Sequence, residues 1–390
     1  MNILFVTASL GLGGSEKCMA EMIRRIDLTK YNVTILSLIK GSYIYRFDER
    51  IRVINGVYPI AEMTAPTKQY VLNIKNWKSP KKIISKIKMA LECKNPKYHI
   101  GEYIWENIKP FVKNFDDEFD AVIGYGQGMA TYFTIDKVTR AKKKILWLNT
   151  DLVKAHYNID YISNFYNQAD AIAADSQNGK KLISILFPKM ANKTVCVPNM
   201  LNVDDIKEKS ALYHPEIDNT CTSILTVGRL CEAKAIHLAV EAATILKNAG
   251  YNFKWYIVGD GSDRSKISAK INELGVADRF ILLGSNNNPY PWFANCDIYV
   301  QTSIYEGSCM TINEAMIFSK PIVTTNFEAA YEKITENNGI ITEMNGGSIA
   351  NAIKKLLDNP ALKNSLSEFL SENQPDYDNY LAVFYSLLNS

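Results

Sequence analysis

The sequence predicts an α/β fold of two domains, each built on an open parallel sheet with helices on both faces. Short apolar runs typical of buried parallel strands alternate with segments of helical periodicity along most of the chain. Many of these runs end in a glycine or a polar residue, which is where an open parallel sheet places its ligand-binding groups. The length of 390 residues favours two hydrophobic cores over one.

The first strand and helix enclose a glycine-rich loop. A strand is expected at residues 3–6, followed by Gly-Leu-Gly-Gly at residues 11–14 and an amphipathic helix at residues 16–25. The backbone at Gly13 and Gly14 can approach an anionic ligand closely at the start of this helix. A tight turn without a ligand is the alternative, because the spacing is not the G-x-G-x-x-G of dinucleotide-binding loops.

Residues 68–97 interrupt the α/β pattern with an excess of lysine. Nine lysines in this segment accompany one acidic residue, Glu92. Ser79 and Pro80 are a good N-cap and first helical residue for a helix after them. Its apolar stripe consists of Ile83, Ile84, Ile87, Ala90 and Leu91. Such a basic amphipathic helix is predicted to lie on an anionic membrane surface, and a solvated helix face is the alternative.

Polar residues follow the remaining strands of the first domain. Gln127 comes after one predicted strand, and Asn149 and Asp151 come after the next. Because parallel strands end at the same edge of a sheet, these three side chains are candidates for a ligand-binding cleft. The polar segment 202–220 is interpreted as a linker. The strands are expected at residues 33–38, 119–125, 144–148, 171–176 and 194–199.

The second domain repeats the alternation of strands and helices. The segment at residues 376–389 is aromatic and leucine-rich. The strands of the second domain are expected at residues 224–227, 254–258, 280–283, 298–300 and 321–325.

Two glutamates, Glu306 and Glu314, flank the predicted start of a helix in the second domain. A buried strand at residues 296–300 precedes them, and the helix is expected to begin near Ser308 or Cys309. The unpaired N–H groups and the dipole of a helix start favour a phosphate. The two carboxylates would then hold the hydroxyls of two sugars on either side of a diphosphate, as in a nucleotide sugar. The alternative is that Glu306 caps the helix and Glu314 is solvated.

Several segments carry motifs that belong together. Residues 306–314 read E-x7-E, and residues 228–234 read G-R-L-x-x-x-K. Residues 256–261 and 281–284 read as further strands with their turns, and residues 11–16 form the glycine loop. The motifs and their order along the chain resemble those of the retaining glycosyltransferases of family 4, also called the glycosyl transferases group 1 family. The resemblance extends from residue 1 to about residue 370.

The resemblance implies the GT-B fold, in which two Rossmann-like domains face each other across a central cleft. Residues 1–202 would be the acceptor-binding domain and residues 203–370 the domain that binds the nucleotide-sugar donor. The last helix, at about residues 371–390, would pack back on the first domain.

The resemblance also implies roles for single residues. Arg229 and Lys234 would bind the diphosphate, Glu306 would touch the hydroxyls of the transferred sugar, and these three would be the catalytic residues. Further donor contacts are implied for Gly13, Gly14, Gly228, Gly284, Cys309, Met310, Thr311 and Glu314, with Glu314 on the ribose, and acceptor or cleft contacts for Gln127, Asn149 and Asp151. No metal or cofactor is expected, since the only D-x-D sequence, residues 376–378, does not end a predicted strand.

The sequence departs from the family pattern at three places. Asn149 stands where many relatives have a histidine, and an amide cannot carry a proton at neutral pH. Ala235 replaces the glycine that usually follows the lysine. Ser308 and Cys309 replace Phe-Gly, which alters the approach of the backbone to the phosphate.

Composition excludes several classes of protein. The net charge of +3 is too small to indicate a nucleic-acid partner. The seven cysteines contain no C-x-x-C pair and the four histidines show no ligand spacing, so neither a disulfide framework nor a zinc site is expected. No signal sequence is recognisable, and no apolar run reaches the roughly 18–20 residues of a membrane-spanning helix. A cytoplasmic protein, peripheral at the inner face of the plasma membrane, is expected.

The function predicted from the resemblance is a retaining transfer of a hexose or N-acetylhexosamine. The donor would be a nucleoside diphosphate sugar, most simply a UDP-sugar, and the acceptor a saccharide carried on a lipid during synthesis of a surface polysaccharide. Two alternatives stay open: a sugar-nucleotide epimerase of the same fold, and a protein that binds sugar nucleotides or glycans with little or no catalysis, which Asn149 would fit. A nicotinamide-dependent oxidoreductase is disfavoured by the spacing of the glycines.

Overall fold

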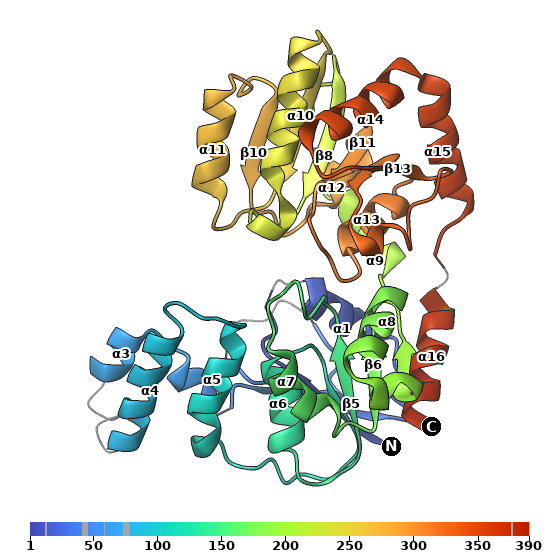
Figure 1. Ribbon diagram of the computed structural model, residues 1–390. Helices are drawn as coiled ribbons and strands as arrows, with labels where there is room; N and C mark the ends of the chain where they lie inside the picture. The colour runs from blue at the N-terminus through green and yellow to red at the C-terminus, as the bar shows by residue number, and fades with distance from the viewer. Residues whose placement is uncertain (12–13, 41–45, 58, 73–78, 376, 390) are drawn as a thin grey trace. The chain divides into compact units, whose positions relative to one another are not determined.

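The computed structural model describes residues 1–390 except residues 12–13, 41–45, 58, 73–78, 376 and 390. The chain divides into two compact units, which are described separately (Figure 1). The N-terminal unit comprises Met1–Met200 together with Tyr377–Ser390, and the C-terminal unit comprises Leu201–Asp376. Gly13 and Asp376, which entered the sequence predictions, lie outside the described residues.

A parallel sheet of seven strands, in the order β3-β2-β1-β4-β5-β6-β7, forms the centre of the N-terminal unit. All residues of β1 after the first are buried, as expected for a parallel strand covered on both faces. The strands are β1 (Asn2–Thr7), β2 (Asn32–Ser37), β3 (Arg52–Asn55), β4 (Phe119–Gly124), β5 (Ala141–Leu148), β6 (Ala171–Ala174) and β7 (Thr194–Cys196). The helices are α1 (Gly14–Arg24), α2 (Ile60–Met63), α3 (Thr67–Leu72), α4 (Pro80–Glu92), α5 (Ile100–Ile108), α6 (Met129–Asp136), α7 (Ile159–Tyr166), α8 (Gln177–Leu186) and α16 (Tyr377–Asn389).

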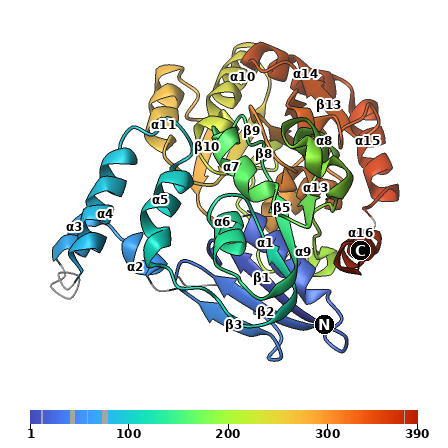
Figure 2. The same ribbon diagram turned by 60° about the horizontal axis from the view of Figure 1, so that its bottom comes forward.

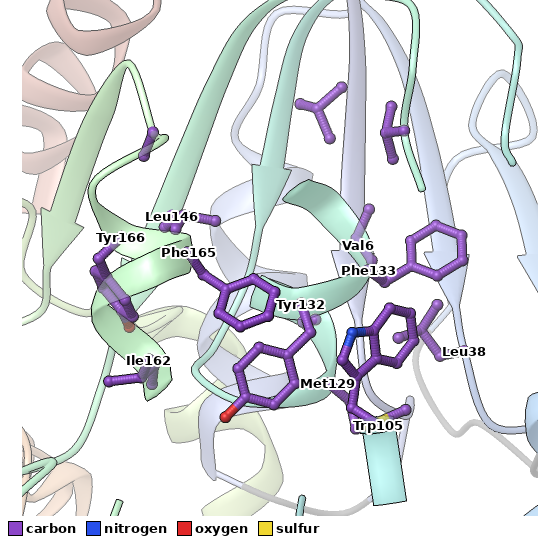
Figure 3. Close-up of a cluster of buried hydrophobic side chains, with 14 of the residues drawn as sticks. Val6, Leu38, Trp105, Met129, Tyr132, Phe133, Leu146, Ile162, Phe165 and Tyr166 are labelled. Atoms are coloured by element: carbon purple, nitrogen blue, oxygen red, sulfur yellow. The ribbon is translucent and has the colours of Figure 1, made fainter. Parts of the chain in front are cut away.

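Aromatic side chains fill the core on the α6 side of this sheet (Figure 3). Trp105 from α5 meets Phe133 of α6 edge to face, with 6.4 Å between the ring centres. Tyr132 of α6 packs on Phe165 of α7 at 4.6 Å. The Trp105 indole N–H donates to Asp136 at 2.8 Å, which satisfies its polar atom inside an apolar cluster. Helix α6 is buried nearly all round and packs against strands β1, β4 and β5.

The C-terminal helix α16 packs within the N-terminal unit (Figure 1). Phe384 is fully buried, and its ring lies 6.1 Å from that of Phe5 and 6.2 Å from that of Trp147. Tyr385 stacks on Tyr31 at 5.2 Å between ring centres, and its hydroxyl accepts a hydrogen bond from the Asp27 N–H. This aromatic contact joins the last helix to strands β1 and β5 of the sheet.

The C-terminal unit contains a second parallel sheet of six strands, in the order β10-β9-β8-β11-β12-β13. Its strands are β8 (Thr222–Val227), β9 (Phe253–Val258), β10 (Phe280–Gly284), β11 (Ile298–Gln301), β12 (Ile322–Thr325) and β13 (Gly339–Thr342). Its helices are α9 (Val203–Ser210), α10 (Ile236–Asn248), α11 (Arg264–Glu273), α12 (Tyr290–Asn295), α13 (Met310–Ile317), α14 (Gly346–Asp358) and α15 (Pro360–Glu372).

Two glycines after β9 allow the turns beyond β8 and β9 to touch. A Cβ atom on Gly259, whose φ is 149°, would lie 1.9 Å from the Gly228 carbonyl oxygen. A Cβ atom on Gly261 would lie 2.3 Å from the Leu230 carbonyl oxygen. No other residue type fits at either place without moving backbone, so these glycines hold the G-R-L turn against the G-D-G turn.

The structure differs locally from the sequence predictions. The predicted linker 202–220 contains helix α9, which Asn202 caps by accepting a hydrogen bond from the Asp205 N–H. A capping asparagine followed by acidic residues is typical of a helix start. The helix was not predicted because the polar composition of the segment also suits a linker. The short strands β3 and β13 were not predicted. Among the described residues, no helix combines the length and the apolar character needed to cross a membrane.

The packing of α16 gives a first prediction. Phe384→Ala is expected to lower the free energy of unfolding of the N-terminal unit by about 3–5 kcal/mol, because it leaves a cavity between Phe5 and Trp147. Urea unfolding followed by tryptophan fluorescence measures the change. Ser386→Ala, at an exposed position of the same helix, should stay within about 0.5 kcal/mol of wild type. A loss below about 1 kcal/mol for Phe384→Ala would show that α16 does not stabilise the unit.

Candidate functional site

Neighbouring strands of the C-terminal sheet bring the residues of the candidate site together. Strands β8 and β11 are adjacent and parallel, so the segments that follow them meet at one edge of the sheet. Lys234 ends a short helical turn after β8, and Glu306 lies in the loop after β11. The two segments are joined by hydrogen bonds from Thr302 Oγ1 to the Lys234 carbonyl and from the Ile304 N–H to the Ala233 carbonyl, both 2.8 Å long.

Glu306 is held through one of its two carboxylate oxygens. Lys234 forms an ion pair with Oε1. The Ser303 hydroxyl donates to the same oxygen at 2.6 Å, and the Gln301 amide donates to it at 3.1 Å. The other oxygen, Oε2, has no hydrogen-bond partner among the residues that the structure describes. The carboxylate is therefore fixed in place and keeps a free acceptor for a ligand hydroxyl.

The ion pair between Lys234 and Glu306 is largely removed from solvent, with 15% of each side chain exposed. Burial by itself lowers the pKa of Lys234, but the negative charge and the hydrogen bond of Glu306 outweigh burial and raise it above its ordinary value. Lys234 therefore stays charged. An ammonium has three N–H donors, so Lys234 can hold Glu306 and still donate to a bound anion.

Helix α13 begins beside this pair without a side-chain cap. Cys309, the residue before the helix, has a φ of 40° and accepts no capping hydrogen bond through its side chain. Burial and then the charge of Glu306 raise the pKa of the Cys309 thiol to about 12, so the thiol is neutral. The N–H groups of Met310 and Thr311 in the first turn, together with the helix dipole, favour an anion at this place.

Arg229 and Glu314 complete the predicted set in this unit. Arg229 is exposed and forms no ion pair among the described residues, whereas the Lys234 side chain is largely removed from solvent. Glu314 is buried within α13, and the Tyr290 hydroxyl donates to it at 3.5 Å. This burial excludes the alternative that Glu314 is a solvated helical residue. Gly284, with a φ of 81°, accepts a hydrogen bond from the Gly259 N–H at 2.8 Å.

Sequence reasoning did not single out three residues of this site. Ser303 and Gln301 contact Glu306 directly. The pattern S-x-x-E at residues 303–306, typical of a capping box, was a signal for Ser303. Lys333 donates from Nζ to Asn313 Oδ1 at 2.5 Å and lies 3.3 Å from Ser308 Oγ, beside the start of α13. No local pattern marks Lys333, because β12 separates it from the helix in the sequence.

The predicted residues of the N-terminal unit lie at the corresponding edge of its own sheet. The Asn149 amide donates to Ser15 Oγ next to Gly14, the first residue of α1. The Asn149 N–H donates to Gln127 Oε1 at 3.4 Å. Asp151 instead accepts two backbone N–H groups of its own turn, at 2.9 and 3.0 Å. Asn149 and Gln127 are thus brought together with the glycine loop, while the Asp151 carboxylate holds the turn after β5.

Comparisons with known proteins show which proteins the chain resembles. Residues 214–372 match the family described as Glycosyl transferases group 1. An N-acetylgalactosamine-N,N'-diacetylbacillosaminyl-diphospho-undecaprenol 4-alpha-N-acetylgalactosaminyltransferase of Campylobacter jejuni is 24% identical over 362 residues, 91% of this chain and 90% of the relative. An uncharacterized glycosyltransferase of Methanocaldococcus jannaschii is 26% identical over 211 residues, so the match spans 51% of this chain and 52% of that relative.

Solved structures agree with the two units described above. The crystal structure of Anabaena Alr3699/HepE in complex with UDP and glucose has a TM-score of 0.71 at 17% identity, with all of both chains covered. A Staphylococcus aureus TarM mutant in complex with Fondaparinux, alpha-GlcNAc-glycerol and UDP has a TM-score of 0.68 at 15% identity, again over the whole of both chains. The family resemblance and the fold class of two Rossmann-like units predicted from the motifs are confirmed.

The ion pair gives a second prediction. Lys234→Met is expected to destabilise the C-terminal unit by about 3 kcal/mol, because it leaves the Glu306 carboxylate buried without its counter-charge. The double variant Lys234→Met/Glu306→Gln should recover most of this loss, since no uncompensated charge remains. Urea unfolding of the single and double variants measures both changes. A double variant no more stable than Lys234→Met alone would show that the charge of Glu306 does not cause the loss.

Proposed function

We propose that the protein is a retaining glycosyltransferase, because residues 214–372 match the glycosyl transferases group 1 family. It transfers a hexose or an N-acetylhexosamine from a UDP-sugar to a saccharide acceptor, and it needs no metal ion. The C-terminal unit binds the donor, and the N-terminal unit binds the acceptor. The acceptor is carried on a lipid, and the product enters a surface polysaccharide.

The observation that carries this proposal is the Glu306 carboxylate. It is anchored at Oε1, has no partner at Oε2 among the described residues, and lies beside a helix start without a side-chain cap. Oε2 accepts a hydroxyl of the transferred sugar, and the first N–H groups of α13 bind the diphosphate. Breaking the bond between the sugar and phosphate places negative charge on the diphosphate, so positive groups must stabilise it. Arg229 and Lys234 supply this charge, each worth about 1–3 kcal/mol in the transition state, or roughly ten- to a hundred-fold in rate.

The path of the proton follows from Asn149. The acceptor oxygen forms a bond to the anomeric carbon, while the bond from that carbon to the phosphate oxygen breaks. An asparagine cannot take up the proton that the acceptor hydroxyl loses. The departing phosphate oxygen therefore receives it, and Asn149, held by Ser15 and Gln127, orients a hydroxyl by hydrogen bonding. The products are UDP and the extended saccharide.

Two similarities support the choice of substrates. The Anabaena and Staphylococcus structures contain UDP, which supports a UDP-linked donor. The Campylobacter relative, which matches nearly the whole chain, is named for transfer of N-acetylgalactosamine to a sugar on diphospho-undecaprenol. That name supports an N-acetylhexosamine and a polyprenyl diphosphate-linked acceptor.

Site variants test this function. Glu306→Ala should lower kcat/KM for the UDP-sugar by about a hundred-fold or more, and Arg229→Ala by roughly ten- to a hundred-fold. Release of UDP with acceptor present, in buffer containing EDTA, measures the rates. Glu273→Ala and Lys266→Ala, at exposed positions of α11, serve as controls and should leave the rates unchanged.

Three outcomes would contradict the proposal in different ways. Unchanged rates in both site variants would remove the assigned site. Stabilisation of the wild type by UDP in a thermal-shift assay, without turnover on any acceptor, would favour a sugar-nucleotide-binding protein. Conversion of the UDP-sugar to its epimer without an acceptor would favour an epimerase.

An exposed apolar face on α4 supports contact with a membrane. Ile84, Ile87 and Leu91 lie on one side of this helix and are 66%, 45% and 70% exposed. Helices α3, α4 and α5 lie side by side at one end of the N-terminal unit (Figures 1 and 2). Isolated exposed apolar residues are ordinary, but three large aliphatic residues on one helix face form a continuous stripe.

The charges around this stripe differ from the sequence prediction at one lysine. Lys86 was counted among the basic residues of the segment, but it is buried and donates to the Met63 and Ala65 carbonyls at 2.5 and 2.7 Å. Burial lowers its pKa. It therefore anchors α4 to the segment around α2. The exposed lysines beside the stripe are Lys81, Lys88 and Lys94. We propose that this face rests on an anionic lipid surface at the cytoplasmic side of the membrane.

Vesicle flotation tests the membrane contact. The wild type should float with vesicles that contain phosphatidylglycerol and remain unbound with purely zwitterionic ones, and raised salt should weaken binding. The variant Ile84→Ser/Ile87→Ser/Leu91→Ser should bind about ten-fold or more weakly, because it loses the apolar area. Ile185→Ser, at a residue 71% exposed elsewhere in the unit, is the matched control. Equal binding by the triple variant and the wild type would exclude this face.

A further inference from the structure

A glutamine at the end of strand β11 connects the two parts of the proposed donor site. Gln301 is the last residue of β11 and is 1% exposed. Its amide nitrogen donates to Glu306 Oε1 at 3.1 Å and to Ser303 Oγ at 2.6 Å. Its amide oxygen accepts from Thr311 Oγ1 at 3.1 Å and from the Tyr299 hydroxyl at 2.5 Å. All of the hydrogen-bonding positions of this side chain that face the site are therefore used.

The orientation of the Gln301 amide follows from the chemistry of its partners. The Glu306 carboxylate is paired with Lys234 and can only accept, so the amide nitrogen must face it. The amide oxygen then faces two hydroxyls, from Tyr299 and Thr311, that can donate. Burial raises the pKa of Tyr299 well above its ordinary value, so this phenol keeps its proton and remains a donor. A reversed amide would place a carbonyl oxygen against a carboxylate.

The same side chain reaches both substrate-binding elements. Thr311 lies in the first turn of α13, where the proposed function places the diphosphate, and Glu306 is the residue proposed to bind the transferred sugar. Gln301 holds both to the rigid end of a buried strand. Ser303 closes the arrangement, because it accepts from Gln301 and donates to Glu306 at 2.6 Å. The Gln301 amide and the Ser303 hydroxyl of this network are both satisfied, and only Glu306 Oε2 has no partner among the described residues. A buried side chain whose hydrogen bonds are all made fixes the geometry of its partners.

We propose that Gln301 is a positioning residue that directs Glu306 Oε2 toward the transferred sugar and sets its distance from the start of α13. This inference rests on the proposed function. Gln301 does not touch the reacting atoms, and its neutral amide moves no proton. Gln301 donates a hydrogen bond to Glu306 and accepts one from Thr311. A second acid at this position would repel Glu306, and an apolar side chain would leave both Glu306 and Thr311 without their partner.

Three variants test this role. Gln301→Leu should lower kcat/KM for the UDP-sugar by about ten- to a hundred-fold, while the Kd for UDP, which lacks the transferred sugar, changes less than about three-fold. Tyr299→Phe removes one hydrogen bond to the amide oxygen and should lower kcat/KM by a few-fold. Retention of UDP binding and of the cooperative unfolding transition distinguishes loss of positioning from loss of the fold.

Gln301→Glu provides a readout that a purely structural role would not change. A carboxylic acid at residue 301 can donate to Glu306 while it is protonated, and it repels Glu306 once it has lost its proton. The variant should therefore approach wild-type activity in acidic buffer and lose activity as the pH rises. The wild type, with an amide at this position, should show no such fall over the same range.

The inference and the proposed function fail separately. If Glu306→Ala abolishes turnover but Gln301→Leu keeps kcat/KM within two-fold, or Gln301→Glu follows the wild-type pH profile, the positioning role is wrong. If the wild type turns over no UDP-sugar, the proposed function is wrong. The urea midpoints of Gln301→Leu, Glu306→Gln and the double variant then test whether Gln301 and Glu306 interact. Shifts that add independently would then overturn the link between Gln301 and Glu306.

Discussion

The largely buried ion pair between Lys234 and Glu306 is the interaction on which the candidate site depends. It joins the segments after two neighbouring strands, β8 and β11, and it sets the direction of a carboxylate whose second oxygen has no partner in the part of the chain that the structure describes. A buried charge pair is tolerated only with additional hydrogen bonds, and Ser303 and Gln301 provide them. Lys234, Ser303 and Gln301 therefore all hold the Glu306 carboxylate in place.

The backbone conformation at the same edge of the sheet favours the binding of an anion. Gly259 and Gly261 bring the turns after β8 and β9 into contact, which positions Arg229 and the segment leading to Lys234. Cys309 takes a left-handed conformation, and helix α13 starts beyond it without a side-chain cap. The family pattern has glycine at this position. Here Cys309 adopts the left-handed conformation instead, and its small buried thiol stays neutral. The site thus combines the charge of Lys234 with the backbone N–H groups at the start of α13.

Several features were predictable because they depend on local sequence. The alternation of apolar runs and helical segments predicted both parallel sheets, and the motifs at residues 228–234 and 306–314 marked the residues that meet at Lys234 and Glu306. Other features were not predictable locally. Lys86 has the same sequence surroundings as its exposed neighbours, yet it lies against the Met63 and Ala65 carbonyls. Helix α9 was hidden by a composition that also suits a linker.

The sequence by itself determined the family resemblance, the α/β fold and the acidic and basic residues of the candidate site, because strand periodicity, glycine turns and short motifs are properties of neighbouring residues. Only the tertiary structure decided which atoms meet. The anchoring of Glu306 through a single oxygen, the placement of Gln301 between Glu306 and Thr311, and the approach of Lys333 to α13 depend on how separate strands end beside one another. Contacts between segments distant in the chain follow from sheet order and packing, which no local pattern encodes.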